Sequence, residues 1–182
     1  MKIDVTDSLQ LKQLVQADAQ ELFALTDRNR EYLKVWLPWL DYTTMVEDSL
    51  KFIALNQKLA EEGKAAAFAL RDRGTIIGVV AFNSFDLINN LAVIGYWLDE
   101  AHQGRGCIRG AVEALCDYGF RTVGLNRVEI RCAVENKKSR KIPEALGFSE
   151  EGILREQEWL YDHYVDHVVY GLLLDEWRSR KK

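Results

Sequence analysis

Residues 94–108 read IGYWLDEAHQGRGCI, an apolar strand pattern that changes, through closely spaced glycines, into the start of a helical pattern. Glycine has no Cβ, so this turn allows the backbone to approach a ligand closely. The unpaired N–H groups of the following helix, together with its dipole, favour an anion such as a pyrophosphate. Arg105 or Arg109 would add positive charge there. The alternative is a tight strand-to-helix turn that binds nothing.

Two well-known phosphate motifs do not fit this turn. A Walker loop would continue with Gly-Lys-Ser/Thr, which residues 94–108 lack. A dinucleotide fingerprint would need its third glycine one position before Gly110. The turn therefore predicts an anion site without indicating either of these two families.

Outward from the turn, hydrophobic periodicity predicts the other elements. Strands are expected at 8–14, 65–71, 75–82, 91–98, 127–134, 151–160 and 164–174, and helices at 17–33, 44–62, 104–121 and 136–146. Thr43 or Thr44 opens the second helix, with Glu47 at the capping-box spacing from Thr44, and Gly63 ends it. We expect one α/β domain over residues 1–182 with a mixed sheet of about seven strands and about four helices.

Composition argues against several classes of protein. The 182 residues carry 24 basic and 28 acidic side chains, a formal net charge of −4, which disfavours a dedicated nucleic-acid-binding protein. No apolar run reaches the ~20 residues of a membrane span, and the N-terminus lacks the apolar region of a signal peptide. Cys107, Cys116 and Cys132 form no CxxC pair, which fits reduced thiols. We therefore expect a cytoplasmic protein with no membrane or direct nucleic-acid partner.

The glycine turn and three other segments resemble one enzyme family. Gln103-Gly104-Arg105-Gly106 resembles the acyl-CoA motif of the GNAT acetyltransferases, Gln/Arg-x-x-Gly-x-Gly/Ala, although Ile108 holds its last position. Three segments resemble the Rim-type ribosomal-protein N-terminal acetyltransferases of that superfamily: residues 29–39 (NREYL, WLPW), 136–148 (NKKS, EALGF) and 158–170 (EWL, Tyr164, Asp166, Tyr170). The similarity is closest to the branch that acetylates the serine N-terminus of the large-subunit stalk protein.

The resemblance implies a single-domain GNAT fold with a mostly antiparallel mixed sheet. It also implies acetyl-CoA as cosubstrate, no metal, direct transfer of acetyl to an N-terminal α-amine of a ribosomal protein, and a homodimer. Two departures from the family pattern bear on these expectations. Tyr161-Asp162-His163 replaces an Asn-Gly turn, which would alter substrate preference, and Pro143 lies inside a short helix, which it would kink.

The resemblance further implies roles for individual residues. Glu158 matches the general base, and Ser139 matches the proton donor to the departing CoA thiolate. A backbone N–H at or near Leu98 would stabilise the oxyanion. The residues expected at acetyl-CoA are Trp97, Leu98, Gln103, Gly104, Arg105, Gly106, Cys107, Ile108 and Asn136, and those expected at the acceptor are Trp36, Trp39 and Tyr164.

Several of these side chains also have a purely structural interpretation. Glu158 would otherwise be a solvated strand carboxylate, since charged residues are usually exposed. Ser139 and Asn136 would be helix caps, and Trp97 would be a core residue. Cys107, at a helix N-terminus, is expected to have a lowered thiol pKa, although no base is evident beside it.

Other activities remain open on the sequence alone. The acceptor could be a small amine, such as an aminoacyl nucleotide antibiotic, a polyamine or an amino acid. The protein could also bind CoA as a non-catalytic sensor, which would need the glycine turn but neither Glu158 nor Ser139. His163 and His167 lie four residues apart, but no third ligand for a metal is evident nearby.

Overall fold

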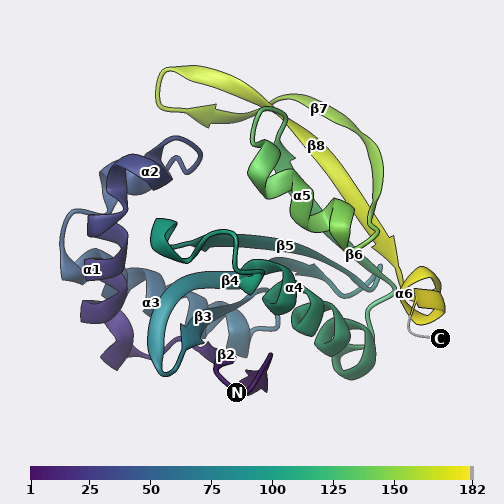
Figure 1. Cartoon of the computed structure of the whole chain (residues 1–182), viewed down its shortest axis with the longest axis horizontal. Coiled ribbons are helices and arrows are strands. Elements are labelled where there is room, and N and C mark those ends of the chain that lie inside the picture. The colour runs from purple at the N-terminus through teal and green to yellow at the C-terminus, as the bar shows by residue number, and fades with distance from the viewer. Residues whose placement is uncertain (181–182) are drawn as a thin grey trace.

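A computed structural model describes residues 1–180 as one sheet with helices on both faces (Figure 1). The strands are β1 (Lys2–Asp4), β2 (Leu9–Gln13), β3 (Ala66–Asp72), β4 (Thr75–Asp86), β5 (Leu91–Leu98), β6 (Arg127–Ala133), β7 (Ser149–Leu160) and β8 (His163–Leu173). The helices are α1 (Ala19–Arg28), α2 (Arg30–Lys34), α3 (Val46–Glu61), α4 (Cys107–Tyr118), α5 (Lys137–Ala145) and α6 (Leu174–Arg180). None of the helices in residues 1–180 combines the length and apolarity that a membrane crossing requires.

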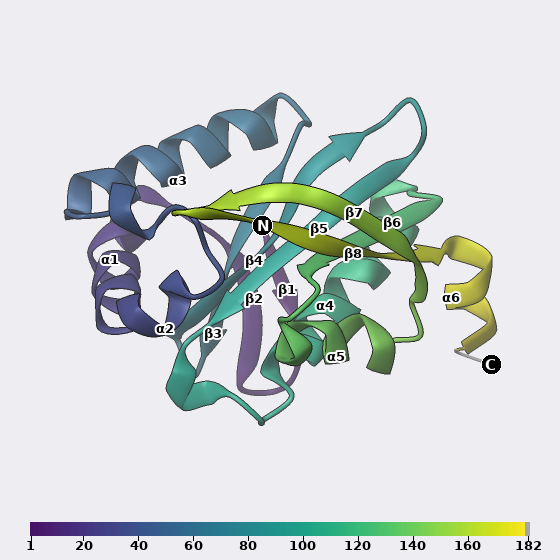
Figure 2. The same ribbon diagram turned by 90° about the horizontal axis from the view of Figure 1, so that it is seen from above.

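The sheet confirms the expected mixed, mostly antiparallel topology. Its strand order is β1-β2-β3-β4-β5-β6-β8-β7, in which β5 and β6 run parallel and the other neighbours antiparallel. Helices α1 and α3 cover one face, while α4 and α5 lie on the other (Figure 2). Along β4, residues 79–82 are buried and alternate between the two cores. The described chain has one strand more than expected, because β1 is too short to show alternation.

The first predicted helix is divided at Asn29. The Asn29 side chain turns back to donate to the Leu25 carbonyl at 2.8 Å, and its oxygen accepts from the Glu100 backbone N–H at 3.0 Å. Arg28 adds an ion pair with Asp99 at 3.4 Å. Helical periodicity continues through the break, so sequence alone predicts one helix. The break ties α1 and α2 to the turn that follows β5.

The start of α3 differs by one residue from the predicted capping box. Asp48, not Glu47, accepts hydrogen bonds from the backbone N–H groups of Thr44 and Met45, at 3.0 and 3.2 Å. The hydrogen bond from Thr44, and that from the Lys51 side chain, lower the pKa of the Asp48 carboxyl. Gly63 follows the helix in a left-handed conformation, as the sequence predicts.

The parallel strands β5 and β6 separate halfway along their length. They pair over Leu91–Ile94 and Arg127–Ile130, after which β6 continues alongside β8 as far as Ala133. Residues 95–98 of β5 therefore have a neighbouring strand on the β4 side but face a gap on the other. Because this gap lies immediately before the glycine turn, it places the open edge of β5 beside the start of α4.

The hairpin of β7 and β8 spans the gap and reaches α2 (Figures 1 and 2). At its tip the Tyr161 hydroxyl donates to the Leu37 carbonyl at 2.6 Å, and the Lys34 ammonium lies 4.6 Å from the centre of the Tyr161 ring. Tyr161 has a φ of 60°, so the turn that replaces the family's Asn-Gly pair keeps a left-handed residue. The hairpin thereby connects β6, with which β8 pairs, to α2 and the segment that follows α2.

Candidate active site

The gap between β5 and β6 opens into two adjoining pockets. The aromatic pocket, of about 600 Å³, has Trp36, Trp39 and Phe52 in its wall. The glycine-turn pocket, of about 860 Å³, lies between the turn and α5. The two pockets share six lining residues: Trp36, Leu37, Tyr96, Trp97, Asn136 and Ser139. Tyr96 and Ser139 are therefore where a molecule in one pocket would meet a molecule in the other.

The glycine turn has the open backbone that its sequence predicts. Gly104 and Gly106 have φ values of 74° and 75°, which residues with a Cβ rarely adopt. Gly106 is the N-cap of α4 and supplies no side chain, so the first N–H groups of the helix remain available to a ligand. All nine residues expected at acetyl-CoA line this one pocket: Trp97, Leu98, Gln103, Gly104, Arg105, Gly106, Cys107, Ile108 and Asn136.

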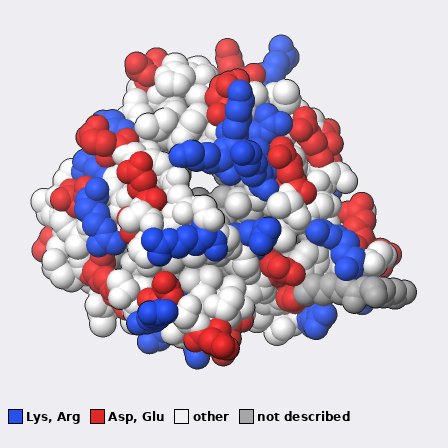
Figure 3. All heavy atoms as spheres, in the orientation of Figure 1, with Lys and Arg blue, Asp and Glu red and all other residues white. Residues whose placement is uncertain are grey.

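Positive charge surrounds the glycine-turn pocket. Arg105 and Arg109 approach it from the turn and α4, and Lys138 and Lys141 from α5. Figure 3 shows Lys and Arg side chains gathered around the central hollow of this face. Gln103 links the two sides, since its oxygen accepts from Lys138 at 3.1 Å and its nitrogen donates to the Tyr32 hydroxyl. Backbone N–H groups and cations together make this pocket suitable for phosphate groups.

The thiol of Cys107 does not have the lowered pKa expected at a helix N-terminus. Burial raises its pKa, and the negative charge of Asp72 acts in the same direction. Arg105 and the backbone oppose these effects but do not outweigh them. Cys107 lines the glycine-turn pocket, and the raised pKa of its thiol disfavours the thiolate form that a nucleophile needs.

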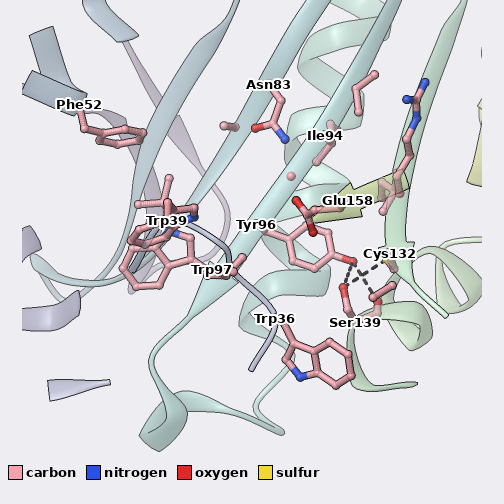
Figure 4. A pocket seen from close by; sticks show the side chains of 18 of the residues that line it. Trp36, Trp39, Phe52, Asn83, Ile94, Tyr96, Trp97, Cys132, Ser139 and Glu158 are labelled. Atoms are coloured by element: carbon pink, nitrogen blue, oxygen red, sulfur yellow. Dashed lines mark hydrogen bonds between the residues drawn. The ribbon is translucent and has the colours of Figure 1, made fainter. Parts of the chain in front are cut away.

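Ser139 makes four contacts with three side chains where the pockets meet (Figure 4). Its backbone N–H donates to Asn136, which caps α5, at 3.1 Å. The Tyr96 hydroxyl donates to the Ser139 carbonyl at 2.9 Å. The Ser139 hydroxyl donates to the Tyr96 oxygen and contacts the Cys132 sulfur, both at 3.3 Å. The capping interpretation is therefore right for Asn136 and wrong for Ser139, whose hydroxyl takes no part in the cap.

Pro143 explains why the Ser139 carbonyl accepts a hydrogen bond from another element. In a regular helix that carbonyl would accept from the N–H four residues later, but proline has none. The Tyr96 hydroxyl takes the vacant position and connects β5 to α5. Burial is the main reason that the pKa of Tyr96 is raised well above its usual value, so the phenol stays a neutral donor. The departure at Pro143 thus anchors the turn that carries Ser139.

Glu158 lies in the aromatic pocket beside His167. Its carboxylate is 3.3 Å from the His167 ring nitrogen, and the two side chains are 33% and 14% exposed. A bulge in β7 brings them together, because the pairing moves from Leu154–His167 to Glu158–Val165. Within the bulge Glu156 has a φ of 50°. Glu158 is thus a partly enclosed carboxylate with a polar neighbour, not a freely solvated one.

The two histidines that sequence analysis considered as a metal pair have separate partners. His163 contacts Asp162 at 2.7 Å at the hairpin tip, whereas His167 faces Glu158. Across residues 1–180 no three His, Cys, Asp or Glu side chains are placed to hold a metal ion. The two histidines therefore lie in different surroundings and do not form a pair.

The expected acceptor residues fall in two places. Trp36 and Trp39 line the aromatic pocket, and Trp97 packs against Trp39 with ring centres 6.1 Å apart. Trp97 is only partly buried and lines both pockets, so the core interpretation describes one side of its ring. Tyr164 lies outside both linings, edge-on to Trp159 at 4.8 Å on the hairpin. Its contact with an acceptor stays a prediction.

The backbone of β5 supplies one more group to the site. The N–H of Asp99 donates to the Ile77 carbonyl of β4 at 2.7 Å. Consecutive N–H groups of a strand point to opposite edges, so the N–H of Leu98 points away from β4 and into the gap. This orientation suits the predicted stabilisation of an oxyanion. The N–H is accessible from the gap because β5 and β6 have separated before Leu98.

Comparison with known proteins identifies the family. Residues 8–149 match the family model described as an acetyltransferase (GNAT) domain. The chain belongs to the GNAT acetyltransferase family. Within that family it is 35% identical over 173 residues to the ribosomal-protein-serine acetyltransferase of Escherichia coli (strain K12). The aligned region covers 95% of this chain and 97% of the relative.

Solved GNAT structures have the same fold over nearly the whole chain. The ribosomal L7/L12 alpha-N-protein acetyltransferase RimL in complex with coenzyme A has a TM-score of 0.93 and 30% identity, covering 97% of this chain and 99% of that one. The microcin C7 self-immunity acetyltransferase MccE, in complex with acetyl-CoA and AMP, has a TM-score of 0.89 and 32% identity, covering 93% and 94%. The similar GNAT proteins thus include enzymes named for different acceptors.

Proposed function

We propose that this GNAT protein transfers the acetyl group of acetyl-CoA to the α-amine of a protein N-terminus, with a ribosomal protein as the acceptor. The observation that carries the proposal is the meeting of two chemically unlike pockets at Ser139, with Glu158 in only one of them. The names of the E. coli relative and of RimL, both acetyltransferases of ribosomal proteins, support the choice of acceptor.

The glycine-turn pocket fits acetyl-CoA. Its unpaired N–H groups at the start of α4 suit the pyrophosphate, and the surrounding Arg and Lys side chains suit the further phosphate. The free edge of β5 at residues 95–98 offers backbone groups to an amide-containing chain such as pantetheine. A thioester that follows this edge reaches Tyr96 and Ser139, where the aromatic pocket begins.

Glu158 would act as the general base for the acceptor amine. An amine attacks the thioester only when unprotonated, and an α-amino group has a pKa of about 7.7–8.0 compared with about 10.4 for lysine. A terminal amine therefore needs modest assistance from a base near neutral pH. Glu158 would take the amine proton directly or through one water, and His167 at 3.3 Å would hold the carboxylate in place.

Ser139 would donate a proton to the CoA thiolate as the thioester bond breaks. Both contacts of its hydroxyl are long, at 3.3 Å, so little hydrogen bonding is lost when the proton turns towards a sulfur. The carbonyl and N–H of Ser139 stay fixed by Tyr96 and Asn136 during that rotation. The N–H of Leu98 would meanwhile stabilise the oxyanion of the tetrahedral intermediate.

An aminoacyl nucleotide is the second candidate acceptor. MccE, a similar structure, was solved with acetyl-CoA and AMP. The Trp and Phe rings of the aromatic pocket offer flat apolar surfaces of the kind on which bases stack. This candidate predicts that a nucleotide-bearing amine is acetylated in preference to a peptide.

Release of the CoA thiol tests both candidates. We expect release with acetyl-CoA and a peptide that begins with serine, and little release with the same peptide after its N-terminus is blocked. A faster reaction with a seryl adenylate analogue would favour the nucleotide acceptor, and no release with any amine would indicate a CoA-binding sensor. Mass spectrometry of ribosomal proteins from cells with the protein or with Glu158→Gln would then identify the acceptor, since only active enzyme adds 42 Da, the mass of one acetyl group.

A further inference from the structure

Asn83 occupies an unusual position in the aromatic pocket. The pairing of β4 with β5 moves from Phe82–Ile94 to Ser84–Val93, which leaves Asn83 as the unpaired residue of a bulge. Bulges are common beside active sites, where they redirect a side chain. The bulge directs the Asn83 side chain onto Gly95, because a Cβ at Gly95 would overlap the Asn83 carboxamide.

The carboxamide of Asn83 has both of its hydrogen-bonding groups available. Within residues 1–180 it makes no hydrogen bond, although a second asparagine of the same pocket, Asn56, donates to the Phe52 carbonyl at 2.9 Å. Figure 4 shows the Asn83 carboxamide and the Glu158 carboxylate reaching into the same pocket from different strands. An amide with a free donor and a free acceptor is chemically matched to a peptide group.

We propose that Asn83 binds the first peptide group of the acceptor, next to the amine that Glu158 deprotonates. This inference rests on the proposed N-terminal acceptor. The attacked thioester lies near Tyr96, and Gly95 directly precedes Tyr96 in β5, so the acceptor chain leaves the reacting amine over Gly95. The absence of a side chain at Gly95 makes the space that the Asn83 carboxamide occupies beside β5, and so allows Asn83 to lie along the path of the acceptor.

This contact distinguishes an α-amine from a lysine ε-amine. The α-amine is separated by a single carbon from a peptide carbonyl, so the amine and the first peptide group reach Glu158 and Asn83 together. A lysine amine follows four methylene groups, so no peptide group accompanies it and Asn83 would be left facing methylene groups. Asn83 is exposed in the free protein, so the discrimination arises when the bound acceptor covers the carboxamide: a peptide group pairs with it, whereas methylene groups displace its water without replacing the hydrogen bonds.

The test compares two acceptors that share the hydroxyl and amine of serine, of which only one carries a peptide group. One is a peptide that begins with serine, and the other is ethanolamine, which has the amine and hydroxyl of serine but no carbonyl. We expect the wild type to prefer the peptide, and Asn83→Leu to reduce kcat/KM for the peptide by about 10- to 100-fold, mainly through KM. The ethanolamine value should fall far less, so that the ratio of the two values drops at least about tenfold.

Two further variants serve as controls. Asn56→Leu removes the carboxamide that already has a partner, and we expect it to preserve the ratio of kcat/KM values. Gly95→Ala keeps Asn83 but displaces its side chain, so it should lower the ratio as Asn83→Leu does, and the double variant should lose no more than either single one. A thermal shift with CoA establishes that each variant is folded.

Two failures are distinguishable. If Asn83→Leu lowers kcat/KM equally for peptide and ethanolamine, or leaves a wild-type preference for the peptide intact, Asn83 does not bind the peptide group and the proposed function still stands. If the wild type shows no preference for the peptide over ethanolamine, the N-terminal acceptor is wrong, and the role of Asn83 falls with it.

Discussion

The two pockets that meet at Ser139 are built in different ways. The glycine-turn pocket takes most of its lining from one continuous segment, residues 96–109, and its binding groups are backbone N–H groups and exposed cations. The aromatic pocket draws its lining from the segment between α2 and α3 and from α1, α3, α5, β4, β5, β6, β7 and β8, and its binding groups are side chains. Substitutions in the aromatic pocket can therefore change the acceptor without disturbing the cosubstrate, which fits a family whose members are named for different acceptors.

The largest effect should come from the acceptor side, at Glu158. Glu158→Gln keeps the size of the side chain but cannot take a proton, so kcat should fall by about 10²- to 10⁴-fold near neutral pH. The loss should shrink between about pH 8 and 9, where an α-amine of pKa about 7.7–8.0 loses its proton unaided. The measurement is kcat against pH for both proteins on one peptide. Parallel curves with a small offset would rule out the general-base role.

On the cosubstrate side, Gly106→Val should abolish binding of CoA. CoA at about 100 times its Kd stabilises the native state by about 2.7 kcal/mol, a rise in Tm of about 5–10 °C for a chain of this size. Valine at a φ of 75° strains the backbone and places a branched side chain against the ligand. The matched control is Gly74→Val, at a φ of 91° in the β3–β4 turn, which should lower Tm but keep the rise with CoA. If CoA still raises the Tm of Gly106→Val, the glycine turn does not bind CoA.

Where the pockets meet, Ser139→Ala should reduce kcat by about 10- to 100-fold, less than Glu158→Gln, because a thiol of pKa about 8.5 is already a good leaving group. Binding of CoA should change little. Stability should also change little, since the cap of α5 is the Asn136 side chain. The measurement is kcat together with the thermal shift by CoA. An unchanged kcat together with a lower Tm would show that the Ser139 hydroxyl stabilises the fold and does not donate the proton.

The smallest effect should come from Pro143, outside both linings. Pro143→Ala restores an N–H that competes with Tyr96 for the Ser139 carbonyl, so we expect Tm to be maintained or raised and kcat to fall by about two- to fivefold. In a Tyr96→Phe background, which already lacks the phenol, the same substitution should leave kcat unaltered. Equal losses of kcat in both backgrounds would show that Pro143 acts by another route.

Local patterns predicted what local structure determines. The glycine turn and the strand before it were predictable because each depends on neighbours in sequence, whereas β1, the break between α1 and α2, and α6 were not predicted. The contacts that complete the site were not readable. Tyr96 reaches Ser139 across 43 residues through a carbonyl that Pro143 leaves free, and His167 meets Glu158 through a bulge that moves the pairing by two residues. Side chains of a strand alternate with a period of two residues, so a shift of two residues leaves the alternation unchanged and no pattern in the sequence reveals it.

The bond from Tyr161 to the Leu37 carbonyl changes the mechanics of the hairpin that carries Glu158. A two-stranded ribbon fixed to the sheet at one end would behave as a cantilever, with its largest thermal displacement near the free tip. Clamped at both ends, the same ribbon behaves as a bridge, and a residue between the supports deflects far less for the same bending stiffness. Glu158 lies in that span, three residues before the clamp. The positional accuracy of a carboxylate on β7 is thus set partly by a carbonyl 124 residues away from Tyr161 in the chain.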